Sequence, residues 1–309
     1  MARLAIQCIL YRSTENLPVL LQSLKEQTFQ DFDVWFYENS EDPKETEREQ
    51  VLIENSGIPF HLIQGEGNNG FSGGHQSLYQ MHSAPFVMLL NDDVRLEPKY
   101  LEMVMARIES DAKIASVTGL IFRWTDHGKF VDTTGLEYFA LGKVVDRFAG
   151  VDAASIQEHL EVSGEVYGVS GAVGIYRRSA VDRAGGLFDP SWFMYKEDVD
   201  LAIRLRKTGG ISWFEPAAVG FHRRGLKEEG KGLWDRLRDE KKRSPKLRAY
   251  SYANQWRIYQ HHLRLSLGLR DIFETFIGEV LRSGMVFLAS PHVFFRAWKM
   301  IITSKPYAS

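Results

Sequence analysis

The stretch of the chain best suited to chemistry is residues 87–94, V-M-L-L-N-D-D-V, in which an apolar run leads into Asn91, Asp92 and Asp93. A short, continuous apolar run predicts a strand that is buried on both faces. Open α/β sheets bind their ligands outside the carboxyl ends of the strands, which is where these acids would lie. Two adjacent carboxylates repel each other, so a divalent cation with oxygen ligands is their natural partner. The alternative is an acidic turn in which one Asp caps a helix that begins near Pro98.

A second group of acids, Glu197, Asp198 and Asp200, opens a predicted helix directly after the aromatic stretch 188–195, F-D-P-S-W-F-M-Y. Acids in a first helical turn complement the helix dipole, and that role alone would explain them. The functional alternative is a general base at the rim of an aromatic-walled pocket. Burial against an aromatic side chain such as Trp192 would raise the pKa of a carboxylate towards a useful value.

Glycines dominate residues 67–75, G-N-N-G-F-S-G-G-H, which lead into a predicted helix. Glycine lets a backbone approach a ligand closely, and a helix N-terminus favours anions. The pattern is neither the dinucleotide fingerprint nor a P-loop, so a tight turn explains it equally well. His222, which comes at the exit of the last predicted strand, is by itself better explained by a structural role than by metal binding.

Alternating strands and helices must position these residues. Apolar runs predict the strands, and leucines at i, i+3, i+4 and i+7 predict the first helix. The expected strands are 4–11, 32–37, 60–63, 87–94 and 114–122, and the expected helices are 15–27, 45–54, 100–108 and one that ends at 81. This alternation predicts an α/β protein with a parallel sheet and right-handed crossovers. Residues 124–161 show little periodicity and are expected to form loops and short strands across one face of the sheet.

The composition is that of an ordinary globular protein: 309 residues, 44% hydrophobic and 25% charged. The net charge of −2 gives no reason to expect binding to nucleic acid. Cys8 is the only cysteine, so a disulfide framework is excluded and a reducing compartment is favoured. We expect neither a signal peptide nor a membrane-spanning helix, because no apolar run reaches about 18–20 residues. A cytoplasmic location follows as an expectation.

The region after His222 changes character. Residues 223–248 contain eleven Lys or Arg against five acids, with glycines in the first half. This composition predicts a basic flexible linker or a flap that closes over an anionic ligand, with Arg223 among its cations.

Residues 249–309 are expected to form amphipathic helices that carry both aromatic and cationic side chains. Such helices suit the surface of an anionic membrane, which would place the protein peripherally at the inner face of the plasma membrane. The alternatives are a helical cap packed on the core and an interface in a homo-oligomer.

Together, the motifs E-N-S-E-D, G-N-N-G-F-S-G-G, L-N-D-D-V, G-G-L-F-D and F-M-Y-K-E-D-V-D, followed by one His, resemble the inverting family 2 glycosyltransferases of the GT-A fold. Within them the chain is most similar to the rhamnosyltransferase-like branch that builds bacterial surface polysaccharides. The resemblance covers about residues 4–222. It implies a Rossmann-like GT-A domain at 1–222, whose mostly parallel central sheet is flanked by helices, with a C-terminal helical extension.

The resemblance also implies a donor site at the ends of the strands. Ile9, Tyr11 and Glu38 match the positions that hold the donor's nucleobase, although the family usually has Asp where Glu38 stands. The positions that line the nucleoside correspond to Asn69, Gly70 and Gly73.

The acids match the catalytic part of the family pattern. Asn91-Asp92-Asp93 stands for the D-x-D motif, with Asp93 as the metal ligand and Asp92 facing the nucleoside or sugar. Asp198 is the implied base, while Glu197 and Trp192 would lie on the acceptor side. His222 matches the histidine that joins the metal, Mn²⁺ or Mg²⁺, or the diphosphate.

These roles imply a metal-dependent, inverting hexosyltransferase that moves a sugar from a nucleotide donor to a hydroxyl of a glycan or lipid-linked glycan. The branch favours dTDP-L-rhamnose as donor, with UDP-galactose, UDP-galactofuranose and UDP-glucose as alternatives. Two other classes remain open at this stage. One is a nucleotidyltransferase or metal-dependent phosphohydrolase on a similar sheet, and the other is a non-catalytic module that binds a nucleotide or a glycan.

Overall fold

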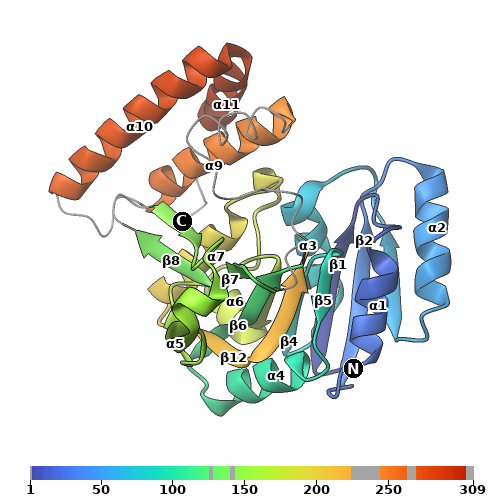
Figure 1. Ribbon diagram of the computed structural model, residues 1–309. Coiled ribbons are helices and arrows are strands. Elements are labelled where there is room, and N and C mark those ends of the chain that lie inside the picture. Colours follow the sequence, from blue (N-terminus) through green and yellow to red (C-terminus); the bar gives the residue numbers. More distant parts are fainter. Residues whose placement is uncertain (1, 125–127, 140–142, 224–243, 263–268, 304–309) are drawn as a thin grey trace.

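The computed structural model describes residues 2–124, 128–139, 143–223, 244–262 and 269–303, with side chains in the last range described from Phe276 onward. Its centre is a ten-stranded sheet in the order β10-β12-β6-β11-β4-β1-β2-β3, with β5 paired to β12 and β7 paired to β6 (Figure 1). The strands are β1 Leu4–Leu10, β2 Phe32–Glu38, β3 Phe60–Gln64, β4 Phe86–Leu90, β5 Val94–Leu96, β6 Ile114–Arg123, β7 Val131–Thr133, β10 Gly164–Val166, β11 Val173–Arg177 and β12 Ile211–His222.

The N-terminal half of the sheet is parallel, as the alternation of strands and helices predicts. Strand β1 pairs in parallel with both β2 and β4, and β2 pairs in parallel with β3. Strand β11 then enters antiparallel between β4 and β6, while β6 and β12 are parallel to each other. The mostly parallel α/β sheet is therefore confirmed, with antiparallel strands added in its second half.

Helices cover both faces of this sheet and connect its strands. They are α1 Leu17–Lys25, α2 Pro43–Glu54, α3 Gly70–Met81, α4 Tyr100–Ser110, α6 Arg178–Arg183 and α7 Glu197–Lys207. The segment expected to hold loops and short strands contains β7, the hairpin β8 (Leu136–Phe139) and β9 (Lys143–Asp146), a 3₁₀ turn at Ala153–Ile156 and the short α5 (Gln157–Leu160).

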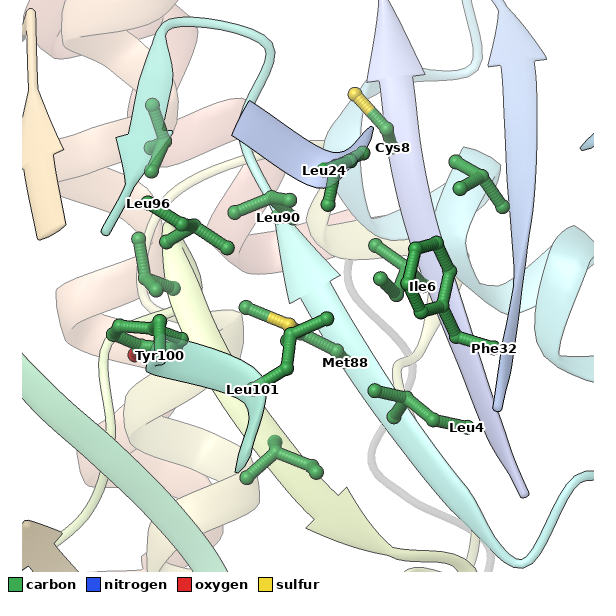
Figure 2. Close-up of a cluster of buried hydrophobic side chains, with 14 of the residues drawn as sticks. Leu4, Ile6, Cys8, Leu24, Phe32, Met88, Leu90, Leu96, Tyr100 and Leu101 are labelled. Atoms are coloured by element: carbon green, nitrogen blue, oxygen red, sulfur yellow. The ribbon is translucent and has the colours of Figure 1, made fainter. Parts of the chain in front are cut away.

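Strand β4 is buried on both faces, as its continuous apolar sequence predicts. Met88 and Leu90 point to the face where the side chains of α1 and α4 pack, including Leu24 and Leu101 (Figure 2). Val87 and Leu89 point to the other face, into a cluster that also contains residues of α6 and α7. Because both faces are packed, the register of β4 is fixed, and so is the direction in which Asn91–Asp93 leave its carboxyl end.

Three C-terminal helices, α9 (Pro245–His262), α10 (Leu269–Ala289) and α11 (Pro291–Thr303), gather at the end of the sheet near α7 (Figure 1). Side chains of α9 and α11 form a small core of their own: Ala249, Tyr252, Ala253, Val293, Ala297 and Ile301. The predicted helical region is thus present. Most of the predicted basic linker or flap, residues 224–243, lies outside the described residues. Among the helices that the structure describes, none has both the length and the hydrophobicity needed to cross a bilayer.

Candidate active site

Two strands bring Asp93 and His222 together at the carboxyl edge of the sheet. Strand β5 follows the acids directly and pairs antiparallel with the end of β12, so His222 lies opposite Val94. The Nε2 atom of His222 is 3.0 Å from Oδ1 of Asp93, and its Nδ1 atom is 2.8 Å from Oδ2 of Asp132 in β7. The imidazole is almost completely buried between the two carboxylates.

This arrangement sets the charge of His222 and its suitability as a metal ligand. Burial alone would lower the pKa of His222, but its hydrogen bonds to Asp132 and Asp93 outweigh burial and raise the pKa to about 9. Once a cation displaces the Nε2 proton, an Asp oxygen beside an imidazole nitrogen is a donor set that fits a divalent cation such as Mn²⁺, and a carboxylate behind the other nitrogen is the usual support for a ligating histidine. Within the described chain, no group of three or more His, Cys, Asp or Glu side chains is placed to hold a metal. A cation bound by Asp93 and His222 would therefore need further oxygen atoms from a bound anionic molecule.

A polar chain links the neighbouring acid to Arg223. The Nδ2 atom of Asn16 donates to Oδ2 of Asp92 (3.2 Å), and Nη1 of Arg223 donates to Oδ1 of Asn16 (3.1 Å). The backbone N–H of Arg223 donates to the carbonyl of Asp93 (2.9 Å). Burial, followed by the adjacent Asp93 charge, raises the pKa of Asp92. Arg223 thus lies beside the acids, as expected of a cation that serves an anionic ligand.

A cavity of about 280 Å³ extends from Asn91, the residue before the first pair of acids, to the second group of acids. Asn91 lines it from the end of β4, while Glu197 and Asp198 line it from the start of α7. The carboxylate of Asp198 accepts hydrogen bonds from the backbone N–H groups of Gly171 (3.1 Å) and Val199 (2.8 Å). A carboxylate has about four lone-pair sites, so these two bonds leave capacity to accept a proton.

Several acids lie close together in this cavity and are shielded from water. Burial, then the charge of Asp146, raises the pKa of Asp198, against the lowering effects of the Gly171 hydrogen bond and the Lys196 charge. The pKa of Glu197 rises to about 8, because of burial first and Asp198 second. Burial also lowers the pKa of Lys196, whose amine donates to the carbonyl of Val144 (3.0 Å). Raised carboxylate pKa values in a cavity mark candidates for proton transfer.

The glycine-rich loop forms the wall between the strand ends and the aromatic loop. Asn69 donates from Nδ2 to the Tyr37 hydroxyl (2.7 Å) and from its backbone to Oδ1 of Asn39 (3.0 Å). Gly70 has φ +71°, and a Cβ atom there would lie 2.4 Å from the carbonyl oxygen of Phe193. Only glycine satisfies both conditions, so this residue permits the close approach of the two loops. At Gly73 a Cβ atom would lie 3.1 Å from Cβ of Asn69, a tighter contact than most.

Two of the predicted site residues have buried side chains, so their contacts with donor and acceptor stay predictions. Glu38 accepts from the N–H of Ser40 (2.5 Å) and hydrogen-bonds the carboxyl of Glu49. Trp192 does not line the cavity, because its ring is fully buried in a cluster with Val199 and Ile258. The reason is the same in both cases: these side chains are used to pack the segments that form the site.

The other predicted residues have definite places. Ile9 is half-buried near the end of β1, beside Tyr37 and Gly74, and Tyr11, which directly follows the strand, is half-exposed. Their contact with a nucleobase stays a prediction. Asp132, behind His222, and Asp146, beside Asp198, were not predicted as site residues. Both fall in the stretch without periodicity, so only their tertiary positions reveal them.

Comparison with known proteins places this geometry in a family. The model of glycosyl transferase family 2 matches residues 8–183. The N-acetylglucosaminyl-diphospho-decaprenol L-rhamnosyltransferases of Mycobacterium tuberculosis strains CDC 1551 / Oshkosh and ATCC 25618 / H37Rv are each 38% identical over 117 residues. That match covers 37% of this chain and 38% of each relative.

Solved structures show the same fold. One is GalNAc-T7 with UDP, GalNAc and Mn²⁺, with a TM-score of 0.63 at 12% identity over 84% of this chain and 48% of the other. Another is the mannosyltransferase PcManGT of Pyrobaculum calidifontis in complex with GDP-Man and Mn²⁺, with a TM-score of 0.56 at 13% identity over 97% and 74% of the two chains. The family model spans more than half of the sequence, and the sheet is that of the GT-A enzymes. The chain therefore belongs to glycosyl transferase family 2 and has the GT-A fold.

Proposed function

We propose that this enzyme transfers a hexosyl group, with inversion, from a nucleotide-diphosphate sugar to a hydroxyl of a glycan or lipid-linked glycan. The observation that carries the proposal is the cavity that Asn91 and Asp198 share at the carboxyl edge of the sheet. In a single displacement, the acceptor oxygen attacks the anomeric carbon as the bond to the diphosphate oxygen breaks. The hydroxyl proton passes to a carboxylate, as in inverting glycosidases with water as nucleophile.

Asp198 is the proposed base. Its carboxylate lines the cavity and is oriented by two backbone N–H groups, so it presents a fixed acceptor for the hydroxyl proton. The raised pKa of Asp198 brings its basicity closer to the operating pH, which favours proton transfer. Glu197, with a pKa of about 8, would line the acceptor side mainly in its neutral form at neutral pH.

Asp93 and His222 are the proposed protein ligands of Mn²⁺ or Mg²⁺, with Asp132 holding the imidazole in place. When bound, such a cation would neutralise charge on the leaving diphosphate. Arg223 would add a second positive charge at the same edge, since its guanidinium reaches Asn16 beside Asp92. The Mn²⁺ and nucleotides named with the two structural neighbours support a divalent cation and a nucleotide donor at this edge.

For the donor we propose dTDP-L-rhamnose, because the mycobacterial relatives are named as L-rhamnosyltransferases. UDP-galactose, UDP-galactofuranose and UDP-glucose are the alternatives. The same relatives are named for a lipid-linked N-acetylglucosaminyl diphosphate, which favours a lipid-linked acceptor and a role in bacterial cell-surface polysaccharide synthesis.

A donor screen tests the proposal. Purified protein is incubated with dTDP-L-rhamnose and with UDP- and GDP-sugars, with and without Mn²⁺ or Mg²⁺, and both thermal stability and sugar release are measured. A donor at about 100 times its Kd should add about 2.7 kcal/mol of stability. Asp93→Ala should abolish the metal-dependent gain, Asp198→Ala should keep it but lose turnover, and the exposed Asp111→Ala should change neither. If no nucleotide sugar binds with any metal, the proposal fails.

The acceptor proposal extends to the membrane, because α10 exposes an apolar stripe. Its members recur at helical spacing and are Phe276, Ile277, Val280, Leu281, Met285, Phe287 and Leu288. Phe287 contacts Phe295 of α11 (ring centroids 5.9 Å apart), which joins the stripe to the exposed Ile302.

The charges around this stripe favour an anionic lipid surface as its occupant. Arg296 and Lys299 are exposed on α11. The one acid between residues 276 and 303 is Glu279, which is buried and paired with Arg282 (2.8 Å). An aromatic and cationic face without exposed acids is typical of helices that lie on the membrane surface. We therefore place the enzyme peripherally at the cytoplasmic face of the plasma membrane.

Flotation with phosphatidylglycerol–phosphatidylethanolamine vesicles tests this location. The intact chain should float, Leu281→Glu and Leu288→Glu should not, and Val162→Glu, a matched change at an exposed apolar residue elsewhere, should float like the wild type. Failure of the wild type to float contradicts the membrane proposal. A wild-type dimer that either α10 variant converts to a monomer would instead make the stripe an interface between two copies.

A further inference from the structure

The loop that leads into Asp198 has a strained backbone. Phe193, Tyr195 and Lys196 have φ values of 61°, 74° and 72°, which non-glycine residues rarely adopt. Such conformations are unfavourable and persist only where the surrounding structure enforces them. The strain therefore raises the question of which groups hold this loop in place.

The main restraint comes from α9, far away in the sequence. The side chain of Asn254 is fully buried, and its Nδ2 atom lies within hydrogen-bond distance of three loop carbonyls. The oxygens are those of Trp192 (3.0 Å), Met194 (2.9 Å) and Tyr195 (2.9 Å). One amide thus contacts the backbone on both sides of Phe193 and next to Lys196.

Two further side chains of α9 extend this contact. Arg257 is buried, donates to the carbonyl (3.0 Å) and hydroxyl (2.6 Å) of Ser191, and lies 4.5 Å from the ring centroid of Trp192. Tyr250 stacks on Phe193 with ring centroids 4.7 Å apart. Positions 250, 254 and 257 follow the i, i+4, i+7 spacing, so a single face of α9 covers the loop.

The same helix reaches the cavity without placing these polar groups in it. Ser251 lines the cavity, whereas Asn254 and Arg257 do not line it and instead hydrogen-bond the loop that forms its wall. On the other side, the N–H of Ser72 in α3 donates to the carbonyl of Phe193 (3.0 Å). The loop is thus fixed between the glycine-rich loop and α9, and Asp198 follows it directly.

We propose that Asn254 and Arg257 are positioning residues of the transfer reaction. By holding residues 191–196 in their strained conformation, they fix the place of the Asp198 carboxylate and of the acceptor wall. The C-terminal helical region is then a functional part of the active site. This inference rests on the proposed role of Asp198 and adds residues to which no role in the reaction has been assigned.

The decisive variant is Asn254→Asp, because Asp has the same shape but presents acceptors to the three carbonyls. We expect kcat for transfer to fall by about 10²-fold, the scale of a 1 Å misplacement, while the Kd for UDP or dTDP with Mn²⁺ stays unchanged. Arg257→Lys keeps the charge but loses the guanidinium fork, and should lower kcat by about tenfold with the same unchanged Kd. Asn55→Asp makes the matched change at the exposed end of α2 and should behave like the wild type.

Amide hydrogen exchange gives a readout that does not depend on turnover. Exchange in a peptide covering 190–198 should be faster in Asn254→Asp and Arg257→Lys than in the wild type, with no change in α1 or α4. Wild-type kcat and exchange in both variants would overturn the inference. If wild-type protein and Asn55→Asp turn over no nucleotide sugar, the proposed function fails, and the exchange result still decides whether α9 holds the loop.

Discussion

At the scale of single residues, the carboxyl pair of Glu38 and Glu49 lies buried beneath the ends of β1 and β2. Burial first, and then the hydrogen bond to Glu38, raises the pKa of Glu49 to about 9 from its ordinary 4.5. Two carboxylates in contact cannot both ionise easily, so the folded protein keeps a proton that the unfolded chain releases above pH 4.5. Since the folded state binds more protons in this window, this pair makes stability fall as pH rises from 4.5 to 9.

We therefore predict that Glu49→Gln stabilises the protein at alkaline pH. The amide can still accept from the N–H of Ser13 and can donate to Glu38, but it does not titrate. Calorimetry at pH 8 should show a Tm higher by about 2–4 °C, the shift expected for about 1 kcal/mol, with a smaller difference near pH 4.5. Glu54→Gln, at an exposed position of the same helix, should not change the pH profile. A variant that keeps the wild-type pH slope would contradict the prediction.

A second residue-scale prediction concerns Gly70. Gly57 has nearly the same φ (+73°) as Gly70, but a Cβ atom there would meet only Nζ of Lys25, at 4.0 Å. Gly57→Ala therefore measures the strain of the left-handed conformation alone, about 1–2 kcal/mol. Gly70→Ala adds a clash with the backbone and ring of Phe193 and should destabilise the protein by more. Urea unfolding compares the two variants, and only Gly70→Ala should also lower turnover. Equal losses of stability and turnover in the two variants would show that the glycine-rich loop and the aromatic loop can move apart without a further cost.

At the scale of elements, Asp200, which lies two residues after Asp198 in α7, anchors this helix. Its carboxylate pairs with Nε of Arg204 (2.7 Å) and with Nε2 of His262 in α9 (2.8 Å). Arg204 also donates to the carbonyls of Ala184, Gly186 and Leu187 beyond α6. Burial alone would raise the pKa of Asp200, but the His262 hydrogen bond and the Arg204 charge outweigh it and lower the pKa.

Asp200→Asn should accordingly destabilise the protein by about 3–5 kcal/mol at pH 7, because it leaves the buried guanidinium of Arg204 without its carboxylate partner. A depressed pKa contributes stability above the unfolded value of 3.8, and that contribution disappears as pH falls through the lower folded pKa. Thermal melts from pH 7 downward should therefore show the difference from the wild type shrinking in acid. Glu165→Gln removes an exposed ion pair with Arg206, which lies on α7, and should change stability by less than about 1 kcal/mol.

At the scale of the whole molecule, the C-terminal helices join the GT-A domain through α9. Neighbouring isoleucines of α11 face in opposite directions: Ile301 is 4% exposed against α9, and Ile302 is 76% exposed on the apolar stripe. The two residues therefore separate the folding role of α11 from its proposed role at the membrane.

Ile301→Ala should destabilise the protein by about 2–5 kcal/mol, as is usual for a buried isoleucine, and should also lower turnover by loosening α9. Ile302→Ala should leave Tm within the range of surface substitutions, about ±0.5 kcal/mol, and weaken vesicle binding instead. Differential scanning fluorimetry and flotation measure the two effects. If Ile301→Ala lowers Tm but not turnover, α9 does not depend on α11 for its place over the loop.

The α/β class, the family and the order of the acids along the chain could be predicted from local sequence patterns. Apolar runs of four to eight residues and helical leucine spacing report local burial, which a strand or helix imposes on neighbouring residues. The apolar run before Asn91 shows this best, since it forms the strand β4 and ends at the predicted edge. For the same reason, the carboxyl-end position of Asp92 and Asp93 followed from the sequence.

Which groups meet at that edge could not be predicted, because it depends on how distant segments pack together. Asp132, Asp146 and Asn254 act on His222, Asp198 and the aromatic loop from segments far away in sequence, and such pairings leave no periodic trace. Glu38 and Trp192 show the converse, because a motif position does not say whether a side chain faces the cavity or the core. The physical reason is that side-chain direction and burial at loop positions are set by the elements packed against them, here α2 beneath Glu38 and α9 over Trp192.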